Sequence, residues 1–201
     1  FLDVPCHGAF RDLTLPPGAS GPAPVVMADE YNNRAVGWGP EGEALVTDMD
    51  RQAILAFNRE GKLLREIGRA REPRLKAPTG VASFGDRIYV ADSGWCQIFV
   101  FSKDGKFLKR FGLKGDDEGQ FNRPGGIAID PERQRLYVVD TGNHRVQVLD
   151  LDGKFLAQIG ARGTGGGEFN FPTAIARDAG GKLYVVDTLN NRVQILDKDG
   201  A

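Results

Sequence analysis

The sequence predicts an all-β protein assembled from repeated four-stranded antiparallel units, and three observations carry this prediction. First, 27 glycines and 11 prolines among 201 residues suit dense turns between short strands better than long helices. Second, an aspartate that ends a short apolar strand recurs at Asp48, Asp92, Asp140 and Asp187, at intervals of 44, 48 and 47 residues. Third, this spacing matches the length of one propeller blade, about 40 to 50 residues. We therefore expect a β-propeller with about four blades visible in the chain.

The clearest repeat unit runs from Phe121 to Gly160. Its four expected strands are Ile127 to Asp130, Leu136 to Val139, Arg145 to Leu149, and Phe155 to Ile159. A Thr-Gly-Asn sequence after Asp140 and the pair Asp152-Gly153 supply turns between these strands. Four such strands, each antiparallel to the next, form one small twisted sheet.

The first strand of each unit recurs in step with the aspartates. It reads AVGW from Ala35, GVAS from Gly80, GIAI from Gly126 and AIAR from Ala174. The third residue is small in every copy, as expected of the innermost strand, where the blades crowd towards the axis. These small residues are Gly37, Ala82, Ala128 and Ala176. The last three copies follow connecting loops that end in proline, a residue suited to strand entry because its φ is fixed and it lacks an N–H.

Two segments resemble NHL repeats, Gly119 to Gly160 and Lys182 to Gly200, which share the pattern LYVVDT followed by Asn-His-Arg or Asn-Asn-Arg. The units Ile88 to Gly112 and Ala35 to Gly68 match less closely because their turns lack this trio. The resemblance covers about residues 35 to 200. It implies a β-propeller, which has six blades in most members of that family.

The chain divides into an N-terminal segment, residues 1–34, and the blades, residues 35–201. Pro16 to Pro24 has the composition of a linker. Phe10 to Leu15 alternates like a strand. The last repeat ends before an outer strand, so we predict that Gly8 to Leu15 pairs with Val193 to Leu196 and closes a four-bladed ring. In the alternative, the 201 residues are a piece of a six-bladed ring.

A second register of the first blade is also open. The residues around Asp29 resemble the last repeat, but Asp29 lies only 19 residues before Asp48, too few for the other strands of a blade. We therefore place the first strand of the first blade at Ala35 to Trp38.

The bulk properties exclude several classes of protein. The formal net charge of −1 creates no global field that favours nucleic acid. The longest apolar runs span only a few residues, too short for a transmembrane helix, so no direct membrane insertion is expected. Cys6 and Cys96 fall in distant parts of the predicted disc, so we expect two free thiols. These two cysteines do not identify the cellular compartment of the protein. We expect an extracytoplasmic location.

The most prominent polar side chains follow the marker aspartates. They are Asn143, His144, Arg145, Asn190, Asn191 and Arg192. In a functional interpretation they line a ligand site, whereas in a structural one the aspartates accept backbone N–H bonds and the arginines pair with carboxylates. We favour the structural interpretation because a set that recurs in every blade is what the architecture itself demands.

No metal or cofactor is predicted. The Asp-x-Asp-Gly sequences at Asp150 and Asp197 lack the third and the distal ligands of a calcium loop and suit hairpin turns. The acidic cluster Asp116 to Glu118 is best explained as a solvated loop tip, with a weak cation site as the alternative. Zinc would lack ligands because His7 and His144 are the only histidines and each cysteine stands alone.

No catalytic residue is predicted either. Peptide-amidating lyases resemble this repeat and carry metal-binding histidines just after the proline that opens an inner strand. The matching positions here hold Thr79, Gly125 and Thr173, so the resemblance does not support that activity. A lactonase would need an acidic set facing the channel, and none can be located in the sequence.

Irregular rim positions are the best candidates for binding, because packing does not dictate them. Trp95 replaces the turn asparagine of the better repeats, so it either anchors a partner or covers a gap between blades. A second irregular feature of the predicted rim is the basic loop with Arg69, Arg71 and Arg74. The segment from Arg65 to Lys76 has a net charge of +3, enough for weak and salt-sensitive RNA binding at most.

The sequence thus favours a non-enzymatic propeller that binds a protein partner or belongs to a larger complex. Trp95, Arg69, Arg71 and Arg74 are its expected contact residues. The alternatives are an enzyme or small-molecule binder that uses the central channel, and an RNA-binding propeller.

Overall fold

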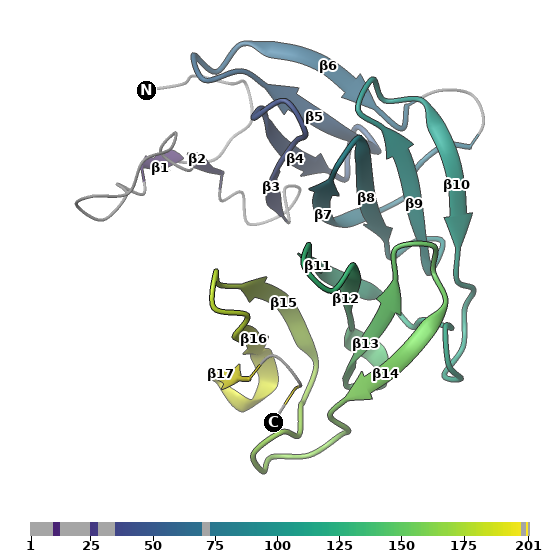
Figure 1. Cartoon of the computed structure of the whole chain (residues 1–201), viewed down its shortest axis with the longest axis vertical. Coiled ribbons are helices and arrows are strands. Elements are labelled where there is room, and N and C mark those ends of the chain that lie inside the picture. The colour runs from purple at the N-terminus through teal and green to yellow at the C-terminus, as the bar shows by residue number, and fades with distance from the viewer. Residues whose placement is uncertain (1–9, 13–24, 28–34, 70–72, 198–199, 201) are drawn as a thin grey trace.

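The computed structural model describes residues 10–12, 25–27, 35–69, 73–197 and 200, and it shows antiparallel sheets that follow one another around an open arc (Figure 1). In each sheet after residue 35, the first strand lies nearest the centre and the later strands lie progressively farther out (Figure 1). This is the arrangement of blades in a β-propeller, so the predicted fold class is confirmed.

Three blades have four strands each. The first contains β3 (Val36–Trp38), β4 (Ala44–Asp48), β5 (Ala53–Phe57) and β6 (Leu63–Ile67). The second contains β7 (Pro78–Phe84), β8 (Arg87–Asp92), β9 (Gln97–Ser102) and β10 (Phe107–Phe111). The third contains β11 (Pro124–Asp130), β12 (Arg135–Asp140), β13 (Arg145–Asp150) and β14 (Phe155–Ile159). The fourth blade has three strands in the described residues, β15 (Pro172–Arg177), β16 (Leu183–Asp187) and β17 (Arg192–Leu196).

The predicted repeat markers fall where expected. Asp48, Asp92, Asp140 and Asp187 end the second strand of the four blades. β3 pairs with β4, which confirms Ala35 to Trp38 as the site of the first inner strand. The third inner strand begins earlier than predicted, at Pro124 rather than at Ile127, because Pro124 already pairs with Asp140 before a break in register.

The blades pack face to face through apolar side chains. At the junction of the third and fourth blades, the buried cluster includes Tyr137, Val139 and Val146 from one sheet and Leu183 and Val185 from the other. The inner strands approach so closely that some positions exclude a side chain. A Cβ added to Gly126 would lie 2.9 Å from the Cα of Ala174 in the next inner strand. This contact explains why small residues recur at the centre of the ring.

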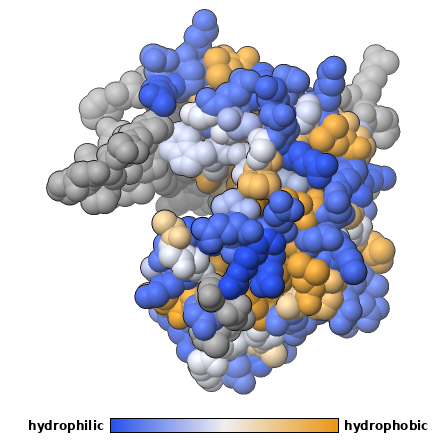
Figure 2. All heavy atoms as spheres, in the orientation of Figure 1, coloured by the Kyte–Doolittle hydropathy of each residue, from blue (hydrophilic) through white to orange (hydrophobic). Residues whose placement is uncertain are grey.

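The outward face of the fourth blade has the same apolar pattern but lacks a covering sheet in the described residues. Val146 and Val148 of β13 are 0% and 3% exposed because the fourth blade covers them. The residues at the matching positions of β17, Val193 and Ile195, are 57% and 60% exposed. We call Val193, Ile195 and the neighbouring Val186 the open face. On the side of the molecule drawn in Figure 2, hydrophilic residues predominate and the hydrophobic ones form separate groups.

The predicted closing strand is wrong in its pairing. β1 (Phe10–Asp12) pairs with β2 (Val25–Met27), whereas β17 pairs with β16 and with no other described strand. A partner close in sequence costs less loop-closure entropy than one at the other end of the chain, which accounts for the local hairpin. Residues 8–9 and 13–24, including the proposed linker, lie outside the described residues, so the domain boundary at residue 34 stays a prediction.

Cys96 is a free and buried thiol, in agreement with the expected absence of a disulfide at this position, and Cys6 lies outside the described residues. Among the described segments, none forms a helix with the length and apolar character needed to span a bilayer.

Candidate functional site

The connecting loops and the turns after the marker aspartates share one rim of the propeller. In the third blade, Pro124 at the start of β11 pairs with Asp140 at the end of β12. Val146, near the start of β13, pairs with Ile159 at the end of β14. Because neighbouring strands are antiparallel, these pairings place the incoming loop and the β12–β13 turn at the same end of the sheet. The candidate site is therefore built from these loops and turns.

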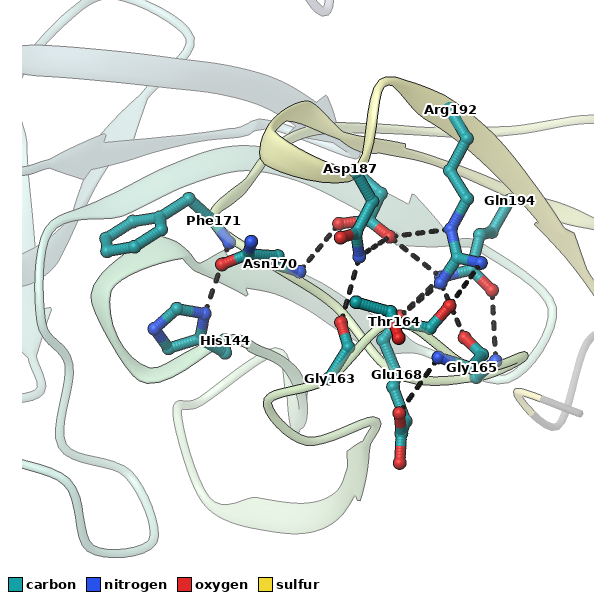
Figure 3. Close-up of polar contacts among 12 residues, drawn as sticks. His144, Gly163, Thr164, Gly165, Glu168, Asn170, Phe171, Asp187, Arg192 and Gln194 are labelled. Carbon is teal, nitrogen blue, oxygen red and sulfur yellow. Dashed lines mark hydrogen bonds and ion pairs between the residues drawn. The ribbon is translucent and has the colours of Figure 1, made fainter.

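Asp187 binds the loop that enters the fourth blade (Figure 3). Its carboxylate accepts hydrogen bonds from the backbone N–H of Asn170 at 2.7 Å and from the side-chain amide of Asn190 at 2.9 Å. It also accepts from Arg192 Nε at 2.8 Å and from Gln194 Nε2 at 3.2 Å. Burial alone would raise the pKa of Asp187, but the hydrogen bonds from Asn170, Asn190 and Arg192 outweigh it and lower the pKa below its usual value.

The other ends of these side chains bind carbonyl groups of the same loop (Figure 3). Asn190 Nδ2 donates to the carbonyl of Gly163 at 2.9 Å. The guanidinium of Arg192 donates to the carbonyls of Thr164 and Glu168, both at 2.9 Å. The turn that follows Asp187 therefore holds the loop along much of its length.

The third blade repeats this arrangement. Asp140 accepts from the backbone N–H of Asn122 at 2.7 Å, from Asn143 Nδ2 at 2.9 Å and from Arg145 Nε at 2.9 Å. Gln147 completes the set through a 3.1 Å bond to the same carboxylate. We call each set a loop clamp. The two clamps are Asp140, Asn143, Arg145 and Gln147, and Asp187, Asn190, Arg192 and Gln194.

The first two blades use their marker aspartates differently. Asp92 accepts only backbone N–H groups among the described residues, including those of Lys76 at 2.6 Å and Trp95 at 3.0 Å. Asp48 accepts from the backbone N–H of Arg51 at 2.8 Å, and its carboxylate lies 3.5 Å from Arg51 Nε. The turn of the second blade therefore lacks a clamp of this kind, and its side chains bond to backbone carbonyls instead, Ser93 to Ala77 and Trp95 to Arg74.

Trp95 lies on the rim of the second blade and is 46% exposed. Its indole N–H donates to the backbone carbonyl of Arg74 at 3.0 Å, so its one polar group is satisfied within the protein. The ammonium of Lys76 lies 5.4 Å from the centroid of the ring, at cation–π distance. We call Trp95, Arg74 and Lys76 the Trp95 patch. It combines an oriented aromatic ring with two exposed cations.

The structure brings together only some of the predicted partner-binding residues. The backbone carbonyl of Arg74 accepts the indole N–H of Trp95, so these two residues lie together. Arg69 instead donates a hydrogen bond to Glu66 on the outer strand β6 at 2.8 Å, and this bond raises the pKa of Arg69. Arg71 lies outside the described residues.

A second feature of the rim lies at the junction of the third and fourth blades. Phe171 donates its backbone N–H to His144 Nδ1 at 3.2 Å (Figure 3). The two rings meet edge to face, with centroids 4.4 Å apart. Arg123 places its guanidinium 5.4 Å from the centroid of Phe171. Burial, then the charge of Arg162 and more weakly that of Arg123, lower the pKa of His144 below its usual value of 6.5.

The remaining predicted positions show no grouped chemistry. Asp116, Asp117 and Glu118 are exposed. Asp150 accepts the backbone N–H groups of Asp152 and Lys154, both at 2.9 Å, which is the hairpin turn predicted there. Within the described residues, no three His, Cys, Asp or Glu side chains are grouped so that they could hold a metal ion.

The positions that follow the prolines carry hydroxyls or no side chain. Thr79 donates to the carbonyl of Pro124 in the next inner strand at 2.7 Å. The hydroxyls of Thr173 and Thr188 are 2.8 Å apart and both residues are exposed. These contacts link inner strands and turns and supply no acid or base.

Sequence reasoning missed the two glutamines of the clamps and the contact of Arg123, Phe171 and His144. The glutamines had a visible signal, because Gln147 and Gln194 occupy the same place in the two best repeats. The contact across the junction had none, since its residues come from different blades and the repeat pattern does not show which blades touch there.

The fold and the site together define a β-propeller in which the turns of the third and fourth blades are hydrogen-bonded to the connecting loops that precede them. The chain belongs to the family described as a 6-bladed beta-propeller, whose model matches residues 70–151 and 132–201. The finer assignment to NHL repeats stays a prediction from the sequence.

Solved structures with the same fold include several enzymes. A gluconolactonase from Xanthomonas campestris is 20% identical, with a TM-score of 0.66 over 88% of this chain and 63% of its own. Virginiamycin B lyase from Staphylococcus aureus, in a catalytically inactive form with quinupristin, is 16% identical, with a TM-score of 0.62 over 97% and 58%. Kuenenia stuttgartiensis hydrazine synthase is 17% identical, with a TM-score of 0.61 over 92% and 49%. The chain thus spans less than two thirds of each, and this likeness concerns the fold alone.

Proposed function

We propose that this propeller is a protein-interaction scaffold, or a subunit of a larger complex, and that the Trp95 patch binds an acidic segment of its partner. The observation that carries the proposal is that the side chain of Trp95 is both exposed and held in place. Its ring is 46% exposed although its N–H is already bonded to Arg74 and its face is approached by Lys76. An aromatic ring held in place before binding loses little conformational entropy on docking, a property of interface hot spots.

The charges of the patch favour an acidic partner. Arg74 and Lys76 are exposed, and no ion pair to either is found among the described residues. Their charges are therefore available to carboxylates, and two cations around an aromatic ring give both steering and specificity. Arg69, at the base of the same loop, is 60% exposed along its side chain and adds to the field, although Glu66 partly neutralises it.

The loop clamps support a scaffold in a different way. Their aspartates, arginines and amides are bonded to backbone groups of the connecting loops, so these prominent polar residues are engaged in holding the rim. A rim held in this way presents a preformed surface, which suits docking of a partner without rearrangement.

The competing function is an enzyme or a small-molecule binder at the central channel. This alternative is suggested by the likeness to a gluconolactonase and to virginiamycin B lyase, which is a likeness of fold. We rank it second because Thr79, Gly125 and Thr173 stand where the peptide-amidating lyases carry histidines.

The test compares two tryptophans. Peptide ligands are selected from a random library displayed on phage, and their affinities are measured for the wild type, Trp95→Ala and Trp38→Ala. Trp38 is a matched control because it is 40% exposed on the inner strand of the first blade, away from the patch. We expect acidic peptides whose binding weakens by about 2 kcal/mol in Trp95→Ala and is unchanged in Trp38→Ala.

Equal effects of the two substitutions would sink the proposal. Saturable turnover of lactone or peptide substrates by the wild type would favour the enzyme instead. Binding to unstructured RNA that persists at physiological salt would favour the third function, because a patch of this size loses electrostatic affinity there.

A further inference from the structure

Arg123, Phe171 and His144 form one continuous stack where the third and fourth blades meet on the rim. Arg123 directly precedes Pro124, which begins β11, and Phe171 directly precedes Pro172, which begins β15. The guanidinium of Arg123 lies over the ring of Phe171 at 5.4 Å, and the edge-to-face contact with His144 continues the stack. We call these three residues the junction stack. It stands beside the inner strands, at the mouth of the ring.

Two members of the stack have a costly backbone conformation. Arg123 and Phe171 have φ values of 53° and 50°, in the left-handed region that residues with a Cβ rarely adopt. His144 also has a positive φ, of 56°, but Gln52, Cys96 and Asn191 share it, so that conformation belongs to the repeat. Ala77, the residue before the proline of the second blade, is not among the residues with positive φ. Arg123 and Phe171 hold matching positions in the third and fourth blades, so this conformation recurs in these two blades and is absent from the second.

The imidazole of the stack is neutral. His144 Nδ1 accepts the backbone N–H of Phe171, which requires that this nitrogen carries no proton. Burial and the nearby charges of Arg162 and Arg123 also oppose protonation. A hydrogen bond with the backbone of Phe169 and the charge of Asp187 act in the opposite direction, but the pKa of His144 is still lowered.

The two arginines are not neutralised by the protein. Arg123 and Arg162 are exposed, and neither has an ion pair with a carboxylate among the described residues. Arg162 is held in the same loop as Phe171, since its backbone forms a bridge with Phe169. The carboxylate of Asp187 also acts on His144, but it is already bonded within its loop clamp. The charges of Arg123 and Arg162 both act on His144, and neither is balanced by an ion pair among the described residues.

We propose that Arg123 and Arg162 bind a small oxyanion, a carboxylate or a phosphate, at the junction stack. Guanidinium groups match the planar, two-oxygen geometry of these anions and can donate two parallel hydrogen bonds to each. The guanidinium of Arg123 lies over the ring of Phe171, and His144 contacts Phe171 through both its ring and its backbone N–H. This site is separate from the Trp95 patch and does not depend on it.

The binding test uses His144 as a reporter. Its ring proton signal, assigned by its loss in His144→Asn, is followed by NMR at constant pH and ionic strength while chloride is replaced by inorganic phosphate or by acetate. An anion that offsets the charges of Arg123 and Arg162 raises the pKa of His144, so we expect a saturable shift and an upward move of its titration midpoint. A phosphate response stronger than the acetate response identifies a phosphate site, and the reverse identifies a carboxylate site.

Three variants separate the site from general charge effects. Arg123→Gln and Arg162→Gln should each weaken the anion response by roughly tenfold or more, because each removes a charge-assisted hydrogen bond. The matched control is Arg110→Gln, since Arg110 is also exposed and lies 5.9 Å over a phenylalanine ring, that of Phe99. It should leave the response unchanged.

A linear drift of the His144 signal that is the same in all variants would overturn the proposal. The same holds if Arg110→Gln reduces the response as much as Arg123→Gln does. If Arg123→Gln lowers the melting temperature, Arg162→Gln decides the outcome, because Arg162 lies outside the stack.

Discussion

Arg145 Nε lies 2.9 Å from Asp140 Oδ2, and Arg192 Nε lies 2.8 Å from Asp187 Oδ2, so two blades carry the same ion pair in different surroundings. The side chain of Arg145 is 8% exposed, whereas that of Arg192 is 31% exposed. Removing one partner of a buried pair leaves the other charge without compensation, and water relieves that cost where it can enter.

The first prediction compares these two pairs. Arg145→Met should lower the free energy of unfolding by about 3 kcal/mol or more, because Asp140 then stays buried without its cation. Arg192→Met should cost roughly half as much, since solvent reaches its site. Urea denaturation of both variants measures the difference. Equal losses would show that burial of the pair does not set the energy of the clamp.

The second prediction concerns pH. His144 has a lowered pKa, so the folded state favours the neutral imidazole. Its contribution to stability is complete above the unfolded pKa of about 6.5 and is lost as the pH falls through the lower folded value. Relative to His144→Asn, the wild type should therefore lose stability between about pH 6.5 and more acidic values. Asn is the suitable replacement because Asn191 adopts the same backbone conformation at the matching position of the fourth blade.

Thermal melts of both proteins from about pH 5 to 8 provide the measurement. A stability difference that does not change over this interval would contradict the assignment of a neutral, buried imidazole. The other histidine, His7, is present in both proteins and cancels from the comparison.

The third prediction uses the open face. Val148 pairs with Tyr137 in the third blade, and Ile195 pairs with Tyr184 in the fourth, so the two positions are equivalent. Val148→Lys should unfold the protein or cost several kcal/mol, because an unpaired charge is forced between two sheets. Ile195→Lys should change stability by less than about 1 kcal/mol, since its side chain is exposed to water. A large loss in Ile195→Lys would show that the open face is covered in solution.

The fourth prediction concerns the centre of the ring. Gly126→Ala places a methyl group 2.9 Å from the Cα of Ala174, and backbone on that side can yield only by moving the inner strand. The expected cost is about 1–3 kcal/mol. Gly166→Ala is the control, because a Cβ added at Gly166 would meet no atom within 4 Å and the φ of this residue is not in the left-handed region. Calorimetric melting temperatures of the two variants should differ by several degrees.

The blades could be predicted because the same physical demand recurs in each. Asp140 and Asp187 accept backbone N–H groups of an incoming loop, so an aspartate at this place satisfies buried donors in every repeat and its spacing reveals the blade length. The inner glycines and alanines are equally informative, since the crowded centre excludes larger side chains there. Residues that recur once per blade therefore mark positions where the packing of the blades restricts the side chain.

Other features depend on partners that a single sequence does not pair. The alternation near Phe10 identifies a strand, but this strand pairs with β2 and not with β17. The sequence pattern of a strand does not show which other strand it pairs with. The contact of His144 with Phe171 crosses two blades and depends on how they rotate against each other. Trp95 stood out as irregular, yet only the structure reveals that Arg74 receives its indole N–H.

The loop clamps also indicate where one unit of this protein ends and the next begins. The turn of the third blade bonds to the loop that precedes that blade, through Asn143 to Gly115 and through Arg145 to Asp117. A blade is therefore hydrogen-bonded to the loop that precedes it. If a blade were exchanged without this loop, these hydrogen bonds would be lost. The natural module for duplication or exchange is thus loop plus sheet, from about Gly112 to Ile159 in the third blade. In chimeras made by exchanging modules at these borders, each module would keep its own loop clamp.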